Sequence, residues 1–97
     1  MATYVVLCNF TDQGIRNVQD TVKRAEAFKV LAKANGATIK DIYWTLGQYD
    51  LVVTFEASDD ATVVALGLSL GKAGNIRSQT LPAFDAAAMT KILAKVV

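Results

Sequence analysis

The chain has 97 residues, 53% of them apolar, with ten basic and nine acidic side chains and a net charge of +1. This length predicts one domain spanning residues 1–97, and the balanced charge gives no basic surface for nucleic acid or for an anionic membrane. No apolar run reaches the roughly 20 residues of a transmembrane helix, so neither nucleic acid nor a membrane is expected as a partner.

The first third of the chain predicts a strand and a long helix. Residues 3–10 (TYVVLCNF) are nearly all apolar and rich in β-branched and aromatic side chains, which is typical of a central strand. Thr11 or Asp12 can cap a helix start, and Asn35-Gly36 supplies a left-handed stop. Apolar residues recur between them at helical spacing, so we expect one long amphipathic helix with these inward positions: Ile15, Val18, Val22, Ala25, Phe28, Leu31 and Ala32.

Two β-rich runs, residues 38–46 and 48–57, are separated only by Gly47 and therefore predict a hairpin. Tyr49 alternates with Leu51 and Val53, so we expect it in the core rather than as a catalytic group. Tyr49, Leu51, Val53 and Phe55 share one face, which should meet the helices. The other face, at residues 48, 50, 52, 54 and 56, mixes polar and apolar side chains and should meet another subunit or a cavity.

A second helix is predicted over residues 61–72, after an acidic start at Asp59 and Asp60. It carries no charge before Lys72, which favours packing on more than one side, and Gly67 and Gly71 indicate close helix packing.

The C-terminal part predicts a strand and a short helix. Residues 76–81 form a strand that runs into Pro82, which suits an edge position. Asp85 then caps a last helix, whose apolar residues are expected to point inward: Met89, Ile92, Leu93 and Val96.

The order βαββαβ plus a C-terminal helix predicts an α+β, ferredoxin-like fold, a four-stranded antiparallel sheet of order 4-1-3-2 with both helices on one face. The other face is left uncovered, and more of the chain is apolar than one small core can hide. We therefore expect a homodimer or higher homo-oligomer.

Gly47-Gln48-Tyr49-Asp50, within the stretch TLGQYDLVV of residues 45–53, resembles the GYD domain family, named for that Gly-x-Tyr-Asp motif. Residues 11–14 and 74–77 fit the resemblance as well. It implies a ferredoxin-like dimeric α/β barrel without an assigned activity. The hairpin is also similar to the effector domains of feast/famine (Lrp/AsnC-like) regulators, which oligomerise and bind amino acids or similar metabolites. This chain lacks their DNA-binding helix-turn-helix.

The residue inventory excludes several kinds of site. The chain has no histidine and one cysteine, Cys8, so zinc sites of the His/Cys kind, Ser-His-Asp and Cys-His catalysis, and an internal disulfide are not available within one chain. No metal and no cofactor are expected. A lone cysteine suits a reducing compartment, and the N-terminus does not resemble a signal peptide, so we expect a cytoplasmic protein.

One group of polar and aromatic residues remains as a candidate pocket. The predicted topology brings the end of the first strand, the hairpin and the start of the fourth strand to one edge of the sheet. We expect the following residues there: Asn9, Tyr43, Trp44, Asp50 and Arg77. In the functional interpretation Arg77 holds an anionic group and Asp50 accepts a proton. In the structural one, which we favour, Asp50 and Arg77 form an ion pair and Asp50 caps backbone amides at the hairpin.

Two main functions compete. The first is an oligomeric domain without catalysis that binds a small molecule or serves as an assembly module. The alternative is a small cofactor-independent enzyme of the dimeric α/β-barrel type, monooxygenase-like, acting on an apolar or aromatic substrate, with Tyr4 added to the pocket residues; it requires a cavity that side chains leave open. A third possibility is an accessory subunit that binds a different protein through its surface helices.

Overall fold

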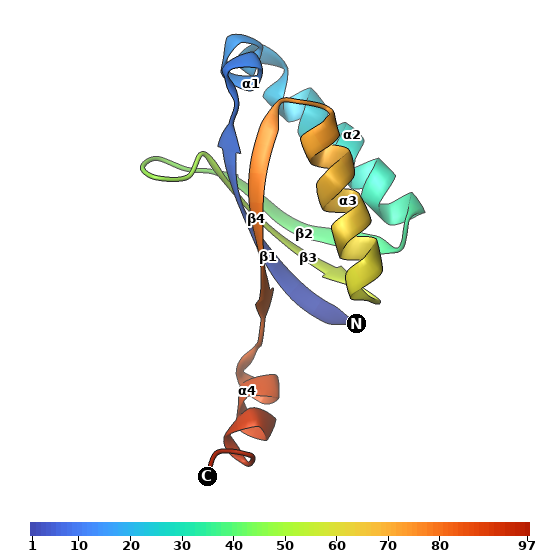
Figure 1. Cartoon of the computed structure of the whole chain (residues 1–97), viewed down its shortest axis with the longest axis vertical. Helices are drawn as coiled ribbons and strands as arrows, with labels where there is room; N and C mark the ends of the chain where they lie inside the picture. The colour runs from blue at the N-terminus through green and yellow to red at the C-terminus, as the bar shows by residue number, and fades with distance from the viewer.

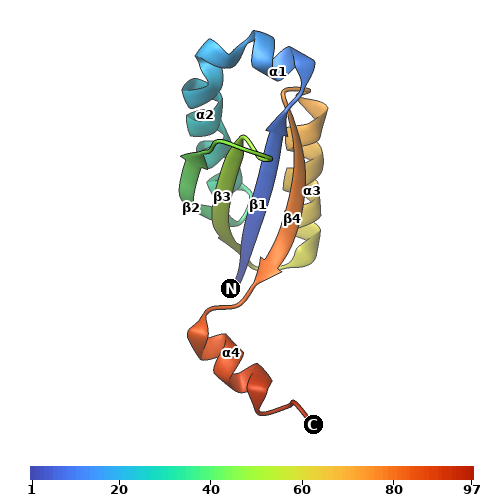
Figure 2. The same cartoon turned by 90° about the vertical axis from the view of Figure 1, so that its left-hand side faces the viewer.

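The computed structural model describes residues 1–97. One four-stranded antiparallel sheet has the order β2-β3-β1-β4, and two helices cover one of its faces (Figures 1 and 2). The strands are β1 (Ala2–Phe10), β2 (Ala37–Trp44), β3 (Leu51–Ala57) and β4 (Ile76–Ala83). The helices are α1 (Asp12–Arg16), a 3-10 turn η1 (Val18–Asp20), α2 (Thr21–Ala34), α3 (Asp60–Lys72) and α4 (Ala86–Leu93).

The ferredoxin-like arrangement predicted from the sequence is confirmed. The observed strand order is the predicted 4-1-3-2 read from the other edge, with β1 central between β3 and β4. Pro82 lies on the edge strand β4, where its missing N–H costs no ladder hydrogen bond. No helix is long and apolar enough to cross a membrane.

The core lies between the sheet and the two covering helices. The buried residues of β1 and β3 alternate along each strand, and so define the face that α2 and α3 cover. Tyr4 of β1 stacks on Phe55 of β3 with ring centroids 5.2 Å apart. The members of this core are Tyr4, Val6, Cys8, Ala32, Ala37, Leu51, Val53, Phe55, Ala57, Val63, Leu66 and Ile76.

The segment predicted as one long helix is divided into α1, η1 and α2. Thr11 caps α1, since its hydroxyl accepts a hydrogen bond from the Gly14 N–H at 3.1 Å. The chain leaves helical geometry at Asn17, whose side-chain amide donates to the Gln13 carbonyl and ends α1. The predicted stop at Gly36 is confirmed, with φ +89°. The prediction of a continuous helix was therefore wrong at Asn17, and Ile15 is exposed.

The hairpin is looser than predicted. β2 ends at Trp44 and β3 begins only at Leu51, so residues 45–50 form a loop that projects beyond the sheet (Figure 1). Gly47 at the tip has φ +107°, and Leu46 beside it is fully exposed. Tyr49 lies in this loop and is half-buried, so the prediction that it belongs to the core was wrong. The hydroxyl of Thr45 donates to the Tyr49 carbonyl at 2.6 Å and closes the loop instead of strand pairing.

Helix α3 begins as predicted but is packed less tightly than expected. Asp59 caps it by accepting a hydrogen bond from the Thr62 N–H at 2.7 Å, and this bond holds the pKa of Asp59 below its usual range. Val64 and Leu68 on its outer side are exposed. A Cβ atom added at Gly67 or Gly71 would meet nothing within 4 Å, so the expected close packing at these glycines is absent within the chain.

Helix α4 is separate from the rest of the domain. It follows β4 beyond the end of the sheet and packs on neither the sheet nor α2 or α3 (Figures 1 and 2). The predicted cap is confirmed, since Asp85 accepts from the Ala88 N–H at 2.8 Å. The inward positions predicted for this helix are wrong, because Met89 and Leu93 are exposed. The projecting helix helps to raise the radius of gyration to 14.6 Å, above the value of about 13 Å usual for this length.

Candidate functional site

The residues predicted to form one pocket lie on both faces of the sheet. Asn9 pairs with Arg77 across β1 and β4, on the uncovered face. Tyr43 pairs with Val52 and also lies on that face. Trp44 follows Tyr43 and pairs with Leu51, so it lies on the face that the helices cover. The five residues therefore do not line one cavity.

Asp50 is held by the backbone of β1. Its carboxylate accepts a hydrogen bond from the Phe10 N–H at 2.9 Å, and its own N–H donates to the Cys8 carbonyl at 2.8 Å. Asp50 and Arg77 form no ion pair, since the two ion pairs of the chain are Lys29–Glu26 and Lys40–Glu56. The predicted backbone cap is present and the predicted ion pair is not.

Trp44 joins the end of β2 to the start of α2. Its indole Nε1 donates to the Thr21 hydroxyl at 3.0 Å, which satisfies the one polar group of the ring. Thr21 is the first residue of α2. Trp44 thus contacts a helix that covers the sheet, but it remains 43% exposed, and none of the five predicted residues lines the pocket between the sheet and the helices.

That space contains an open, largely apolar pocket of about 400 Å³, called here the helix–sheet pocket. Its floor is the covered face of the sheet and its walls are α2 and α3. Fourteen of its 21 lining residues are apolar. The lining includes Cys8 in the floor, Thr21 and Arg24 of α2, and Leu66 and Gly67 of α3.

The pocket exists partly because small residues stand where large ones would fill it. Val63, Leu66, Gly67 and Leu70 share the inner side of α3, by their spacing of three and four. Gly67 lines the pocket, and a Cβ built on it meets no atom within 4 Å. The missing side chain leaves part of the volume. A glycine on the inner side of a helix of large apolar residues was the available sequence signal, and it was interpreted as close packing.

The polar groups of the pocket are few. Arg24 is its one charged lining residue, and Thr21, Ser69, Asn75, Ser78 and Thr80 supply uncharged polar groups. Cys8 lies in the floor and is 2% exposed, and burial raises the pKa of its thiol to about 11. The thiol is therefore protonated at neutral pH and a poor nucleophile.

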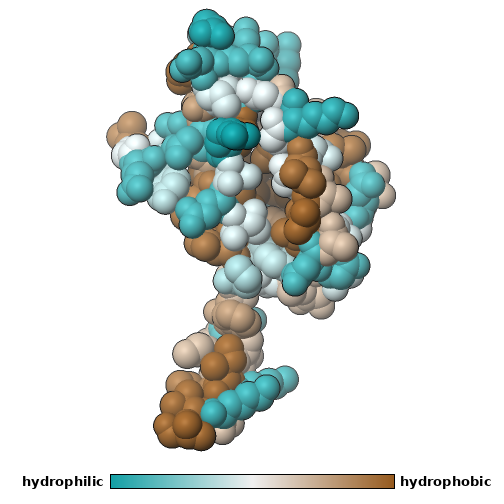
Figure 3. Space-filling view, in the orientation of Figure 1, coloured by the Kyte–Doolittle hydropathy of each residue, from teal (hydrophilic) through white to brown (hydrophobic).

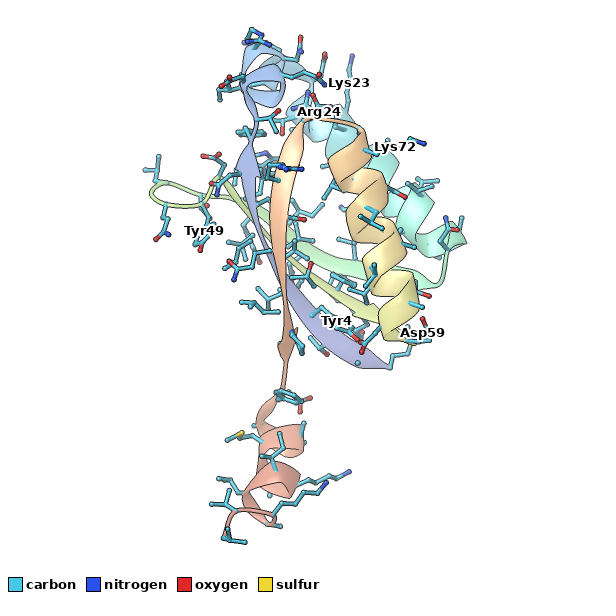
Figure 4. All side chains as sticks on the ribbon, viewed as in Figure 1. Tyr4, Lys23, Arg24, Tyr49, Asp59 and Lys72 are labelled. Atoms are coloured by element: carbon cyan, nitrogen blue, oxygen red, sulfur yellow. The ribbon has the colours of Figure 1, made fainter.

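The rest of the chain offers one further pair of polar side chains at a helix start. The Tyr4 hydroxyl donates to an Asp60 carboxylate oxygen at 2.6 Å, at the far end of the sheet from Arg24 (Figure 4). This bond and the neighbouring carboxylates raise the pKa of Tyr4. No group of three or more His, Cys, Asp or Glu side chains is placed to hold a metal ion.

The sequence matches the GYD domain family over residues 4–93, from the third residue of β1 to the end of α4. The Gly-x-Tyr-Asp segment, residues 47–50, lies in the hairpin loop, and its aspartate is the residue bound to β1. No curated protein matches the chain.

Proposed function

Because the chain belongs to the GYD domain family, a designation that names no reaction, we propose from its geometry that the protein binds a small apolar molecule in the helix–sheet pocket. The observation that carries the proposal is the open apolar volume of about 400 Å³ between the sheet and its two helices. Ligand pockets in proteins commonly have about 300–1,000 Å³, mostly apolar walls and a few polar groups. The pocket has each of these properties.

The chemistry of the lining favours binding over catalysis. None of the lining residues is a carboxylate, histidine, lysine or tyrosine, so no general base faces the bound molecule. The Cys8 thiol, with its pKa of about 11, is protonated. The alternative of a cofactor-independent enzyme requires an open cavity, which is present, but also a group that accepts a proton from the substrate.

Two glycine variants of α3 test the proposal with the neutral fluorescent probe N-phenyl-1-naphthylamine, which brightens in apolar surroundings. Gly67→Leu places a large side chain on the inner side of α3, where the lining has a gap. Gly71→Leu makes the same change one helical turn on, at a residue that does not line the pocket. We expect the wild type and Gly71→Leu to bind the probe and Gly67→Leu to lose at least tenfold in affinity.

Equal probe binding by the three proteins, with unchanged unfolding temperatures, would contradict the proposal. Native mass spectrometry of the purified protein adds an independent test. A mass that co-purifies with the wild type and is absent from Gly67→Leu identifies the natural ligand directly.

A second observation favours self-association, in which the pocket domain works as a homo-oligomer. Only 13 of the 97 residues are buried in the single chain, although 53% of the residues are apolar. The uncovered sheet face, seen in Figure 2, carries Val5, Leu7 and Val52 among polar residues. Apolar side chains also gather on α4 (Figure 3). Surfaces of this kind mark protein–protein contacts, and pairing of two open sheet faces yields the dimeric α/β barrel that we propose.

Charge substitutions on the uncovered sheet face test the assembly. Leu7→Lys places a cation at the centre of that face, whereas Gln79→Lys, at the position paired with Leu7 on the edge strand, changes one polar residue for another. Light scattering coupled to size-exclusion chromatography should find an oligomer for the wild type and Gln79→Lys and a monomer for Leu7→Lys. A wild-type monomer at micromolar concentration would refute this part of the proposal.

A further inference from the structure

Arg24 is the one charged side chain that lines the helix–sheet pocket. It lies in the first turn of α2 and is half-buried. A cation beside an apolar cavity is costly unless a partner compensates its lost hydration. Arg24 therefore needs partners for its guanidinium.

The protein itself satisfies only part of the guanidinium. One terminal nitrogen donates to the Asn17 carbonyl at 2.7 Å, and the other to the Gly14 carbonyl at 3.4 Å. A guanidinium has five N–H donors, so three remain after these two bonds. Arg24 forms no ion pair, and no acidic residue lines the pocket.

The two carbonyl contacts also hold the side chain in place. They tie Arg24 to α1 and to the residue that ends it, so the guanidinium does not have to be ordered when a ligand arrives. A polar group that is fixed before binding saves the entropy of ordering it. The Asn17 carbonyl, which also accepts from the Asp20 N–H at 3.1 Å, thus positions Arg24 from the point where α1 ends.

The charges around this end of the pocket are mixed, since the acidic Asp20 directly precedes α2 and two lysines lie nearby. Lys23 precedes Arg24 on α2, and Lys72 is the last residue of α3 at the same end of the helix pair (Figure 4). Neither lysine forms an ion pair. The start of α2 at Thr21, which lines the pocket, adds the positive end of a helix dipole. The pocket lining itself is apolar apart from a few uncharged polar groups and the single cation Arg24.

We propose that the natural ligand is an apolar monocarboxylate, with its apolar body on the sheet floor and its carboxylate on Arg24. This inference rests on the proposed binding function and names the ligand class for the same pocket. A planar guanidinium matches a carboxylate in a two-bond geometry. A phosphate group carries more charge than one lining cation balances, and a pocket with 14 apolar lining residues favours a single charged group on the ligand.

Decanoate and decan-1-ol provide the test, because they have the same apolar chain and differ in the charged group. Both are titrated against the wild type by displacement of N-phenyl-1-naphthylamine. We expect decanoate to bind at least tenfold more tightly than decan-1-ol, the effect of charge-assisted hydrogen bonds. Arg24→Met should remove this preference and leave the affinity for decan-1-ol within about twofold of the wild type.

Lys23→Met is the matched control, since it removes a neighbouring positive charge from a residue that does not line the pocket. In Lys23→Met the logarithm of the ratio of the decanoate affinity to the decan-1-ol affinity should stay at least half of its wild-type value. Arg24→Lys, which keeps the charge and loses the planar fork, should bind decanoate with intermediate affinity. Arg24→Lys also replaces Arg24→Met as the test variant if Arg24→Met does not fold.

The outcomes separate the two proposals. Equal affinities for the two ligands in the wild type would overturn the carboxylate inference and leave the apolar pocket standing. A preference that survives in Arg24→Met would do the same. Failure of both ligands and of the neutral probe to bind would overturn the pocket function and the inference together.

Discussion

The carboxylate of Asp50 accepts a hydrogen bond from the backbone N–H of Phe10 at 2.9 Å, across 40 residues of sequence. The Asp50 N–H donates to the Cys8 carbonyl at 2.8 Å. If β3 began a few residues earlier, one of its backbone carbonyls would accept from the Phe10 N–H. The Asp50 carboxylate takes the place of that carbonyl. The Gly-x-Tyr-Asp segment therefore fixes the hairpin loop to the end of the central strand.

We expect Asp50→Ala to destabilise the domain by about 1–3 kcal/mol, because the Phe10 N–H loses a charged acceptor in a partly buried position. Urea unfolding followed by circular dichroism measures the change. Asp41→Ala is the control, since Asp41 accepts its hydrogen bond from Thr54 at an exposed site of the same hairpin. A loss no greater than that of Asp41→Ala would show that the Asp50 contact contributes little.

Gly14 lies directly against the backbone of Asn75. A Cβ atom added to Gly14 would overlap the Asn75 carbonyl oxygen, and this oxygen also accepts from the Thr11 N–H at 3.1 Å. We expect Gly14→Ala to lower stability by about 1–3 kcal/mol, as overpacking does elsewhere. The control Gly67→Ala has room for the methyl group and should gain about 0.5–1 kcal/mol from helix propensity. Equal effects in thermal unfolding would contradict this account.

Cys8 should react slowly with thiol reagents in the folded protein. Burial raises the pKa of its thiol from 9.0 to about 11, so at pH 8 the thiolate is about a hundredfold scarcer than in an unfolded chain. Limited access adds to this effect, since Cys8 is 2% exposed. Labelling by iodoacetamide at pH 8, with and without urea, measures the ratio. Similar rates in both conditions would show that the pocket floor opens freely.

The same pKa shift predicts how stability depends on pH. The thiol is neutral in both states below pH 9, and the unfolded state loses its proton first as the pH rises. The contribution of Cys8 is therefore complete below pH 9 and is lost between pH 9 and 11, up to about 3 kcal/mol. Urea unfolding of the wild type and Cys8→Ala across this range isolates the effect, because Tyr4 titrates in both. A constant difference between the two proteins would refute it.

Helix α4 should contribute to assembly and not to the fold of its own chain. Deletion of residues 84–97 removes Phe84, Met89 and Leu93, all exposed, without removing core residues. For the wild type we expect the unfolding temperature to rise with protein concentration, as it does when association stabilises the folded state. The truncated chain should show less of this dependence, yet unfold at a similar temperature when dilute. A large loss of stability at high dilution would show that α4 supports its own domain.

Local patterns were sufficient for the order of the elements. The apolar run of residues 3–10, the caps at Thr11, Asp59 and Asp85, and the glycine at residue 36 determine where strands and helices begin and end. These signals act over a few residues, through backbone hydrogen bonds and allowed φ angles. The order βαββαβ then leaves one economical sheet, and its strand order was predicted correctly.

The tertiary structure decided where the site lies. Periodicity placed Tyr49 on a strand, but the Thr45 and Asp50 contacts end the pairing before it and leave the tyrosine in a loop. Proximity to one sheet edge suggested that Asn9, Arg77 and Trp44 share a pocket, yet the alternation of strand side chains puts Trp44 on the other face.

The helix–sheet pocket and the place of α4 depend on packing between elements distant in sequence. A glycine at residue 67 is compatible either with a close helix contact or with a cavity. Which of the two occurs depends on how far α3 lies from the elements that it faces, and in the structure Gly67 lines a cavity. The apolar side of α4 indicates that it is covered, but not whether its own chain covers it. By itself the sequence determined the elements and their order, because these follow from local hydrogen bonding and side-chain pattern. The tertiary structure decided the cavity and the uncovered surfaces, because both depend on how far apart packed elements come to rest.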